Sequence, residues 1–185
     1  VIPTMNKVGL LEKTLGALLV QEPGPECRWE IVVVNDGSTD GTAAFLETVT
    51  GLPEGGRPEV RVVSPGKNVG RARARNLGVR AAQGRWILFL DDDIVVPEGL
   101  LKAHVTLLSA HPGQGTIGYA VTAEELVDGP HFHYLDSRGV ARLGPGPAPG
   151  RYFVTQNAAV PRESFLQVGG FDEGFKGYGF EDMEL

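Results

Sequence analysis

The chain has 185 residues, of which 42% are hydrophobic and 22% are charged, and its formal net charge is −6. This composition is typical of a folded domain with a sizeable core and is too apolar for a disordered chain. The negative balance argues against nonspecific nucleic-acid binding, although a bound metal can supply positive charge locally for a phosphorylated ligand.

The first half of the chain alternates between short apolar runs and segments with helical periodicity. This alternation predicts a doubly wound α/β sheet with right-handed crossovers, in which a mostly parallel central sheet lies inside a three-layer α/β/α sandwich. In chain order, we expect a strand ending at 1–2, a helix over 8–20, a strand over 29–34, a helix over 43–49, a strand over 60–63, a helix over 70–82 and a strand over 86–90.

The second half is less regular. The run from Gly144 to Gly150 is rich in glycine and proline, so it cannot form a regular helix or a central strand. We expect a flexible excursion over 124–150 that lies over a pocket. Around it, the pattern predicts a helix over 98–109, a strand over 117–122, a strand over 152–159 and a helix over 161–168.

The apolar run from Trp86 to Leu90 ends abruptly in three carboxylates, Asp91, Asp92 and Asp93. Unpartnered charges are costly to bury, so these residues must stand at an open strand end, where open α/β sheets bind ligands. Carboxylates are hard oxygen ligands suited to Mg²⁺ or Mn²⁺, and such a cation can in turn hold a diphosphate. The alternative is a solvated acidic turn after a core strand.

The loops after the first two strands, Pro3-Thr4 and 36–41, are expected along the same sheet edge as the carboxylates. An ionised Asp36 only accepts hydrogen bonds, so it can select a base that presents an N–H, such as the imide of uracil. The alternative is that Asp36 merely caps its own turn together with Ser38 and Asp40.

The helix expected over 70–82 is rich in arginine. Arg71 and Arg75 are four residues apart and therefore share a face. A guanidinium on that face could pair with Asp91 or reach a phosphate. Arg73 and Arg80 read as a solvated basic face.

Near the end of the chain, Glu181 and Asp182 follow two glycines with an aromatic residue between them, Gly177-Tyr178-Gly179. Carboxylates on a glycine-flanked loop can take a proton from an incoming hydroxyl, which is the work of a general base. The alternative is an acidic first turn that favours the positive end of a helix dipole.

In this order, the motifs resemble those of family 2 glycosyltransferases, which have the GT-A fold, over almost the whole chain. The resemblance implies a single catalytic domain over 1–185, with a nucleotide-binding half over 1–123 and an acceptor-side half over 124–185. The matching residues are 1–4 with Asn6, 31–40, Asn68, Gly70, 74–76, Gly78, 84–86, 90–93, Asn157, 169–173 and 177–182.

The resemblance also implies a nucleotide-sugar donor, with a UDP-sugar favoured, and an acceptor hydroxyl on a carbohydrate or another molecule. Pro3, Thr4 and Asp36 would hold the base and the ribose. The full set of residues implied in nucleotide binding is Pro3, Thr4, Asp36, Asn68, Gly70, Arg75, Asp91 and Asp92.

By the same resemblance, Asp91 and Asp93 take the two acidic places of the D-x-D motif, so that Mn²⁺ or Mg²⁺ bridges the protein and the donor diphosphate. Some relatives use adjacent aspartates, so the pair that binds the metal stays open. Asp182 matches the catalytic base, with Glu181 beside it. The family is typically inverting: the deprotonated acceptor hydroxyl attacks the anomeric carbon opposite the leaving nucleoside diphosphate.

Two alternatives to this function stay open, a retaining GT-A enzyme and a non-catalytic sugar-nucleotide-binding module or partner-dependent subunit. Cys27 is the single cysteine, which excludes an internal disulfide and fits the cytoplasm. No apolar run approaches the roughly 20 residues that span a bilayer, so no membrane segment is expected in this chain. Because the sequence opens inside a strand and stops inside an acidic motif, we expect both ends to be truncated, and missing regions could attach the protein to a membrane.

Overall fold

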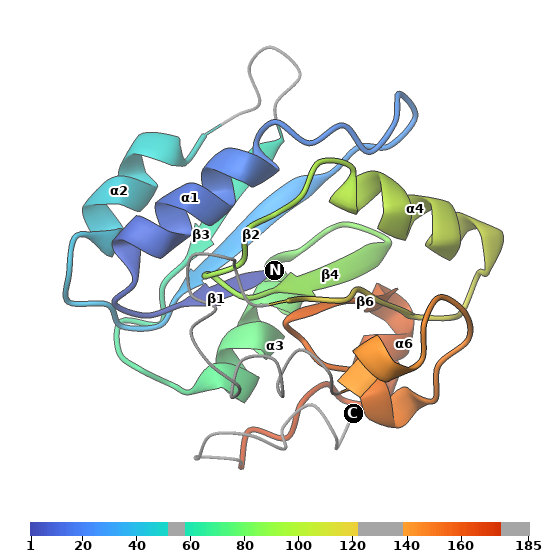
Figure 1. Ribbon diagram of the computed structural model, residues 1–185. Coiled ribbons are helices and arrows are strands. Elements are labelled where there is room, and N and C mark those ends of the chain that lie inside the picture. Colours follow the sequence, from blue (N-terminus) through green and yellow to red (C-terminus); the bar gives the residue numbers. More distant parts are fainter. Residues whose placement is uncertain (52–57, 122–138, 175–185) are drawn as a thin grey trace, which may run out of the picture.

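The computed structural model describes residues 1–51, 58–121 and 139–174. Strands and helices alternate over the first half as predicted, with boundaries that differ by a few residues (Figure 1). These elements are β1 (Ile2–Thr4), α1 (Val8–Leu18), β2 (Glu30–Asn35), α2 (Thr42–Val49), β3 (Glu59–Val63), α3 (Arg71–Ala81) and β4 (Trp86–Leu90).

In the described part of the second half, most helices and strands are shorter than in the first half, and more residues lie in loops. None of the helices in the described residues is both long and apolar enough to cross a bilayer. The remaining elements are α4 (Leu100–Ala110), β5 (Thr116–Ile117), the 3₁₀ helices η2 (Gly139–Arg142) and η3 (Gly150–Tyr152), β6 (Asn157–Pro161) and α6 (Arg162–Gln167).

The strands run in the order β3-β2-β1-β4-β6-β5. β1, β2 and β3 pair in parallel, whereas β6 pairs antiparallel with both β4 and β5. The two groups meet at Val1, whose N–H donates to the Leu88 carbonyl at 2.7 Å and whose carbonyl accepts from Leu90 N–H at 3.2 Å. These bonds follow the parallel pattern. Strand order therefore reverses between β1 and β4, and such a switch point is where open α/β sheets bind ligands.

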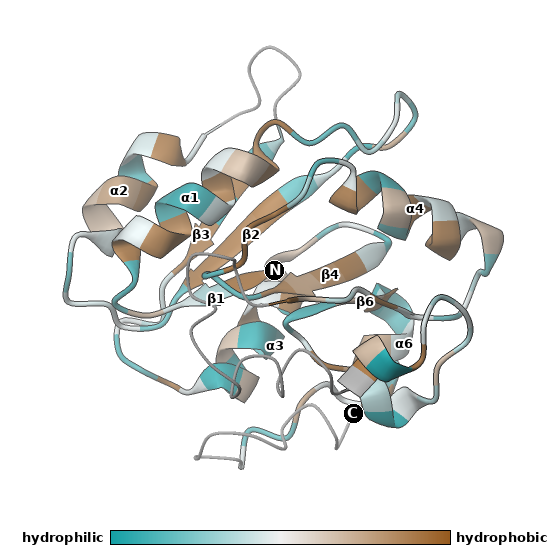
Figure 2. Ribbon diagram, in the orientation of Figure 1, coloured by the Kyte–Doolittle hydropathy of each residue, from teal (hydrophilic) through white to brown (hydrophobic). Residues whose placement is uncertain are grey.

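The sheet is covered by helices on both faces. Ile31 and Val33 of β2 pack into the core beneath α1 and α2, and Val32 packs into the core on the α3 side. Figure 1 shows α1, α2 and α4 on one face and α3 and α6 on the other. Because both faces are covered, β2 and β4 are almost continuously hydrophobic, as Figure 2 shows.

Aromatic side chains attach the late part of the chain to the sheet. The ring of Phe89 in β4 lies 5.4 Å from the rings of both Phe165 in α6 and Phe171, measured between centroids. Phe165 and Phe171 are 5.1 Å apart. Tilted and edge-on aromatic pairs at such distances are favourable beyond their buried area. They hold the segment after α6 against the α3 face of β4.

Two predicted strands are wrong in extent. The strand predicted over 152–159 begins only at Asn157, because its partner β4 ends at Leu90, the residue opposite Asn157. The strand predicted over 117–122 is reduced to Thr116–Ile117, beside β6. In the excursion predicted over 124–150, residues 124–138 lie outside the described residues, and the 3₁₀ helix η2 forms at 139–142.

Candidate active site

The loops that follow β1, β2 and β4 meet at the switch point, as predicted. The hydroxyl of Thr4, the last residue of β1, donates to Asp92 Oδ2 at 2.7 Å. The N–H of Asp36, the first residue after β2, donates to the Thr4 carbonyl at 2.9 Å. Acidic groups that are widely separated in the chain therefore share one sheet edge. Glu181 and Asp182 lie outside the described residues.

Asp92 is the member of the triplet whose side chain points inward, where its bonds hold the turn after β4 in place. Its side chain is 7% exposed and lies between the Thr4 hydroxyl and the ammonium of Lys7, which is 3.2 Å from Asp92 Oδ1. The hydroxyl of Thr14, on α1, donates to the carbonyl oxygens of Asp92 and Ile94, each at 3.0 Å. Both carboxylate oxygens and the backbone of Asp92 are thus committed to internal bonds.

Asp91 pairs with Arg75, one of the two arginines on the helix face for which either this pair or a phosphate contact was expected. A terminal nitrogen of Arg75 donates to Asp91 Oδ1 at 3.2 Å; the Arg75 side chain is buried, and that of Asp91 is half-buried. Burial raises the pKa of Asp91, the Arg75 guanidinium opposes the rise, and the charge of Asp93 adds to it, so that the pKa lies above its ordinary value. A divalent cation would favour the ionised form of such a carboxyl.

Asp93 is the most exposed member of the triplet. Its side chain is 40% exposed, and its Oδ2 accepts from the Lys7 ammonium at 2.7 Å. Lys7 therefore bridges Asp92 and Asp93, a contact that the sequence analysis missed. The available signal was a basic residue immediately before the α1 helix, in a loop predicted to lie beside the triplet.

Asp36 is buried and anchors the start of α3. One of its carboxylate oxygens accepts from Val69 N–H at 2.7 Å and the other from Gly70 N–H at 3.1 Å. The alternative in which it caps its own turn with Ser38 and Asp40 is wrong, because its partners come from the loop after β3. A carboxylate has further lone pairs, so Asp36 can still accept a bond from a ligand N–H.

Asp40 joins the loops that precede α1 and α2. It accepts from Val8 N–H at 3.2 Å and from Thr42 N–H at 3.0 Å, and the bonds from Thr42 hold its pKa below the ordinary value. Asn6, at φ 55°, accepts from Thr39 N–H at 2.7 Å. These bonds fix the loop after β1 against the loop after β2.

The loop before α3 approaches the site through glycines. Gly37 has φ 76°, and a Cβ there would lie 2.5 Å from Asn68 N, which only glycine can accommodate. Asn68 is exposed, with its amide nitrogen 2.7 Å from Met5 Sδ. Gly70, at φ 88°, precedes α3, and Pro3 lies half-buried in β1. Asn68 and Gly70 thus lie on a loop that adjoins Asp36.

Asn76, which the sequence analysis gave no role, anchors the late glycine-rich segment. Its buried amide accepts from Phe171 N–H at 3.0 Å and donates to the Phe171 carbonyl at 2.8 Å and to Glu173 at 3.1 Å. Gly170 has φ 77°, and a Cβ there would lie 2.6 Å from Asn76 Oδ1. The glycine is needed because the backbone approaches this amide so closely.

Arg73 and Arg80 were predicted to form a solvated face, but both contact Glu173. Arg80 lies 3.4 Å and Arg73 3.5 Å from its carboxylate, although both arginines are more than half exposed. The hydrogen bond from Asn76 and the charges of the arginines hold the pKa of Glu173 below its ordinary value. Exposed pairs contribute little stability, so the main anchor of this segment is Asn76.

We expect Asn76→Ala to lower the free energy of unfolding by about 3 kcal/mol, because it leaves the Phe171 N–H and carbonyl groups without partners. Urea unfolding followed by circular dichroism measures this loss. The matched control is Asn68→Ala at an exposed site, which we expect to change stability by less than about 0.5 kcal/mol. Similar losses in the two variants would contradict the anchoring role.

His104 is a buried residue of α4 that lies beside β5 and β6. Its Nδ1 lies 2.7 Å from Thr116 Oγ1, and its Nε2 lies 2.9 Å from Asn157 Oδ1. Burial lowers its pKa, an effect that the Asn157 bond only partly opposes. The neutral ring thus joins α4 to β5 and β6. Its partner Asn157 follows Gln156, whose carbonyl accepts a hydrogen bond from Asp91 N–H at 3.4 Å.

The carboxylate triplet fits a cation shared with a substrate. Among the described residues, no three His, Cys, Asp or Glu side chains gather into a complete metal site. Asp91 and Asp93, however, each use one oxygen in the hydrogen bonds described, and their other oxygens are hard donors. Mg²⁺ is commonly held by one or two carboxylates together with substrate phosphates, and Mn²⁺ also suits carboxylate ligands. The donor set suits that arrangement.

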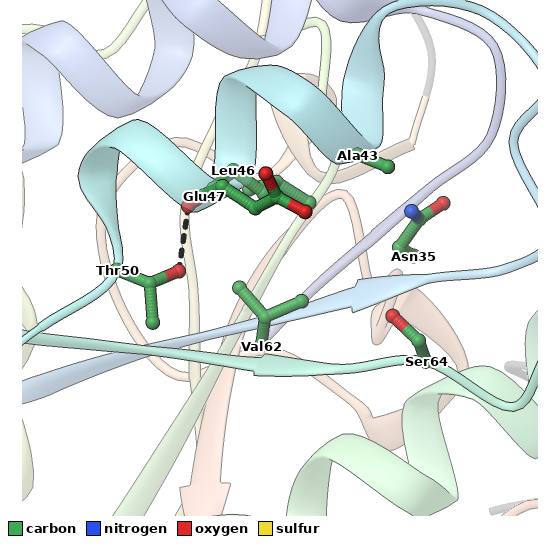
Figure 3. Close-up of a pocket in the computed structure, with 7 residues that line it drawn as sticks. All are labelled: Asn35, Ala43, Leu46, Glu47, Thr50, Val62 and Ser64. Atoms are coloured by element: carbon green, nitrogen blue, oxygen red, sulfur yellow. Dashed lines mark hydrogen bonds between the residues drawn. The ribbon is translucent and has the colours of Figure 1, made fainter.

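A separate hollow of about 450 Å³ lies between α2 and β3 (Figure 3). None of the predicted site residues lines it. Within it, the hydroxyl of Thr50, the residue that follows α2, donates to the Leu46 carbonyl in the last turn of that helix at 2.6 Å. The lining residues are Asn35, Ala43, Leu46, Glu47, Thr50, Val62 and Ser64.

A sequence model of glycosyl transferase family 2 matches residues 1–169. The chain belongs to glycosyl transferase family 2. The resemblance noted from the motifs is therefore confirmed. The match includes the triplet and ends before Glu181 and Asp182.

Solved structures confirm the GT-A fold of this family 2 chain. The mannosyltransferase PcManGT from Pyrobaculum calidifontis, in complex with GDP-Man and Mn²⁺, superposes with a TM-score of 0.69 at 28% identity, covering 93% of this chain and 46% of that one. Staphylococcus aureus TarS 1–349 in complex with UDP-GlcNAc gives a TM-score of 0.69 at 20% identity, covering 99% and 51%.

Among curated proteins, the chain is similar to validoxylamine A glucosyltransferase from Streptomyces hygroscopicus subsp. limoneus. The two are 31% identical over 217 aligned residues, which include 100% of this chain and 46% of the relative. The second validoxylamine A glucosyltransferase, from subsp. jinggangensis, is 30% identical, and 49% of its length is covered. The chain thus spans about half the length of these family 2 relatives.

Proposed function

We propose that this chain is the donor-binding and catalytic part of a metal-dependent glycosyltransferase. It moves a sugar from a nucleoside-diphosphate donor, with a UDP-sugar favoured, to an acceptor hydroxyl with inversion. The observation that supports this most is the position of Asp91 and Asp93. They stand at the carboxyl end of β4, at the switch point, each with one oxygen outside the described hydrogen bonds.

The residues around this edge divide into two roles. Asp91 and Asp93 would hold Mn²⁺ or Mg²⁺, which supplies positive charge where the leaving diphosphate becomes more negative. Asp36 has lone pairs that its two backbone bonds do not use, so it would accept a hydrogen bond from an N–H of the base. Asn68 and Gly70 belong to the neighbouring loop. Asp182 would take the proton from the acceptor hydroxyl.

In this arrangement, Asp92 and Arg75 serve the ligands indirectly. Asp92 is bonded to Thr4 and Lys7 and fixes the turn, so we assign the metal to Asp91 and Asp93 within the triplet. The buried Arg75 guanidinium fixes the orientation of Asp91 through its 3.2 Å bond. A charged bond to a rigid helix restricts the carboxylate, which favours a preorganised metal site.

The relatives support a nucleotide-sugar donor but differ in its identity. The Pyrobaculum structure contains GDP-Man and Mn²⁺, and the TarS structure contains UDP-GlcNAc. The decisive experiment is therefore a panel of UDP-, GDP- and TDP-sugars, in which the complete protein is assayed for release of nucleoside diphosphate. We expect release from at least one donor, its loss with EDTA, and its recovery with Mn²⁺.

The same panel separates the alternatives. A non-catalytic module would bind a donor in the presence of Mn²⁺ and release no nucleoside diphosphate. A retaining enzyme would release it but give a product with the anomeric configuration of the donor, which NMR of the product determines. Absence of both binding and release with every donor would refute the proposed function.

A further inference from the structure

Lys7 bridges two carboxylates of the triplet. Its ammonium lies 2.7 Å from Asp93 Oδ2 and 3.2 Å from Asp92 Oδ1. The positive charge of Lys7 therefore lies beside carboxylates of the triplet, where a divalent cation would also bind.

The two contacts of Lys7 differ in how easily they open. Asp92 is almost fully buried and is held a second time by Thr4, whereas the side chains of Asp93 and Lys7 are each 40% exposed. Exposed ion pairs are weak, because water and salt compete with them. The Lys7–Asp93 contact is thus the one that can exchange for another cation.

The backbone of Lys7 is held at the start of α1, independently of the contacts that its ammonium makes. Its carbonyl accepts from Leu10 N–H at 3.1 Å and from Leu11 N–H at 3.0 Å, at the start of α1. The ammonium is carried on a flexible four-carbon stem, so it can swing away without any change in the helix.

We infer that Lys7 is an internal counter-cation of the triplet, which leaves Asp93 when a divalent cation binds and thereby weakens metal binding to the donor-free protein. This inference rests on the proposed metal-dependent function. Two positive charges, Arg75 at Asp91 and Lys7 at Asp92 and Asp93, balance much of the triplet without metal. A donor diphosphate would offer the displaced ammonium another anion, so donor and metal would bind cooperatively.

The test measures Mn²⁺ affinity of the complete protein without donor, from the EPR signal of free Mn²⁺. We expect Lys7→Met to bind Mn²⁺ about tenfold more tightly than the wild type, because one positive charge beside a partly exposed site is removed. Lys7→Arg keeps the charge and should stay within about twofold of the wild type.

The matched control is Lys13→Met. Lys13 is exposed on α1 and makes no ion pair with another described residue, so the substitution changes the net charge equally without touching the triplet. We expect its Mn²⁺ affinity to remain within about twofold of the wild type. An equal increase in both variants would assign the effect to overall charge and overturn the inference.

Thermal melting gives a second measurement that does not depend on activity. Without Mn²⁺, Lys7→Met should melt below the wild type, because Asp92 and Asp93 lose their shared cation, and added Mn²⁺ should raise its Tm more than that of the wild type. An unchanged or weaker Mn²⁺ affinity in Lys7→Met, with Mn²⁺-dependent donor cleavage intact in the wild type, would overturn the role of Lys7 and leave the proposed function standing. Failure of the proposed function would instead appear as a silent donor panel.

Discussion

Asp182→Asn is expected to reduce sugar transfer by about a hundredfold or more while leaving donor affinity unchanged. The amide has nearly the shape of the carboxylate but cannot accept the proton of the acceptor hydroxyl. The measurement compares kcat for transfer with the Kd for the nucleoside diphosphate in the presence of Mn²⁺. A loss confined to kcat is the signature of a group that acts in the transition state.

Glu181→Gln is the matched control, since it removes the same charge from the adjacent residue. We expect a smaller loss of transfer in this variant. A larger loss in Glu181→Gln would assign the base to Glu181. Equal losses of donor binding and transfer in Asp182→Asn would make Asp182 a structural residue.

The described part of the chain shows how a late motif is tied to the triplet. Arg75 and Asn76 are consecutive residues of α3: the first bonds Asp91, and the second bonds the backbone of Phe171. Phe171 also packs on Phe89 of β4, the strand that leads to the triplet. One rigid helix thus positions both the triplet and the segment that precedes Asp182, and catalytic groups need such rigid support.

The sequence allowed the first half of the fold to be predicted because its signals are local. Apolar runs alternate with helical periodicity from Val1 to Leu90, and the parallel strands place their carboxyl ends at one edge. Helical spacing likewise placed Arg71 and Arg75 on one face, with a pair to Asp91 as one of two expected uses of that face, and Arg75 makes this pair. These predictions required no knowledge of distant partners.

The rest depended on contacts that no local pattern reveals. The start of β6 is set by the end of β4, its antiparallel partner, rather than by the propensity of residues 152–156. Lys7 and Asn76 acquire their roles from Asp93 and Phe171, far along the chain. Asp91, Asp92 and Asp93 are chemically identical, so only their different burial and partners distinguish them.

Because of that difference, we expect substitution of Asp92 to lower stability and substitution of the adjacent Asp93 to lower metal affinity. Asp92→Asn is expected to lower the free energy of unfolding by about 2 kcal/mol, because a buried carboxylate bonded to Thr4 and Lys7 is replaced by a neutral group with one acceptor oxygen. For a chain of this size, the corresponding fall in Tm is about 4–8 °C.

Asp93→Asn should do the reverse. Its half-exposed side chain contributes little to folding, so stability should change by less than about 0.5 kcal/mol. Mn²⁺ affinity should fall by more than about tenfold, since even the partners of metal ligands are commonly worth that much. Thermal melting and Mn²⁺ titration of both variants measure the two effects independently.

The paired result decides how the triplet is used. At the end of β4, neighbouring aspartates can serve different purposes. Asp92 turns toward Thr4 and the core and is structural, whereas Asp91 and Asp93 on either side of it are more exposed and can bind a ligand. Loss of Mn²⁺ affinity in Asp92→Asn at unchanged stability, with Asp93→Asn binding normally, would mean that the metal uses adjacent aspartates. Lys7 would then have to leave Asp92 for the cation to bind, and the buried carboxylate would have to turn outward, at the expense of its bond from Thr4.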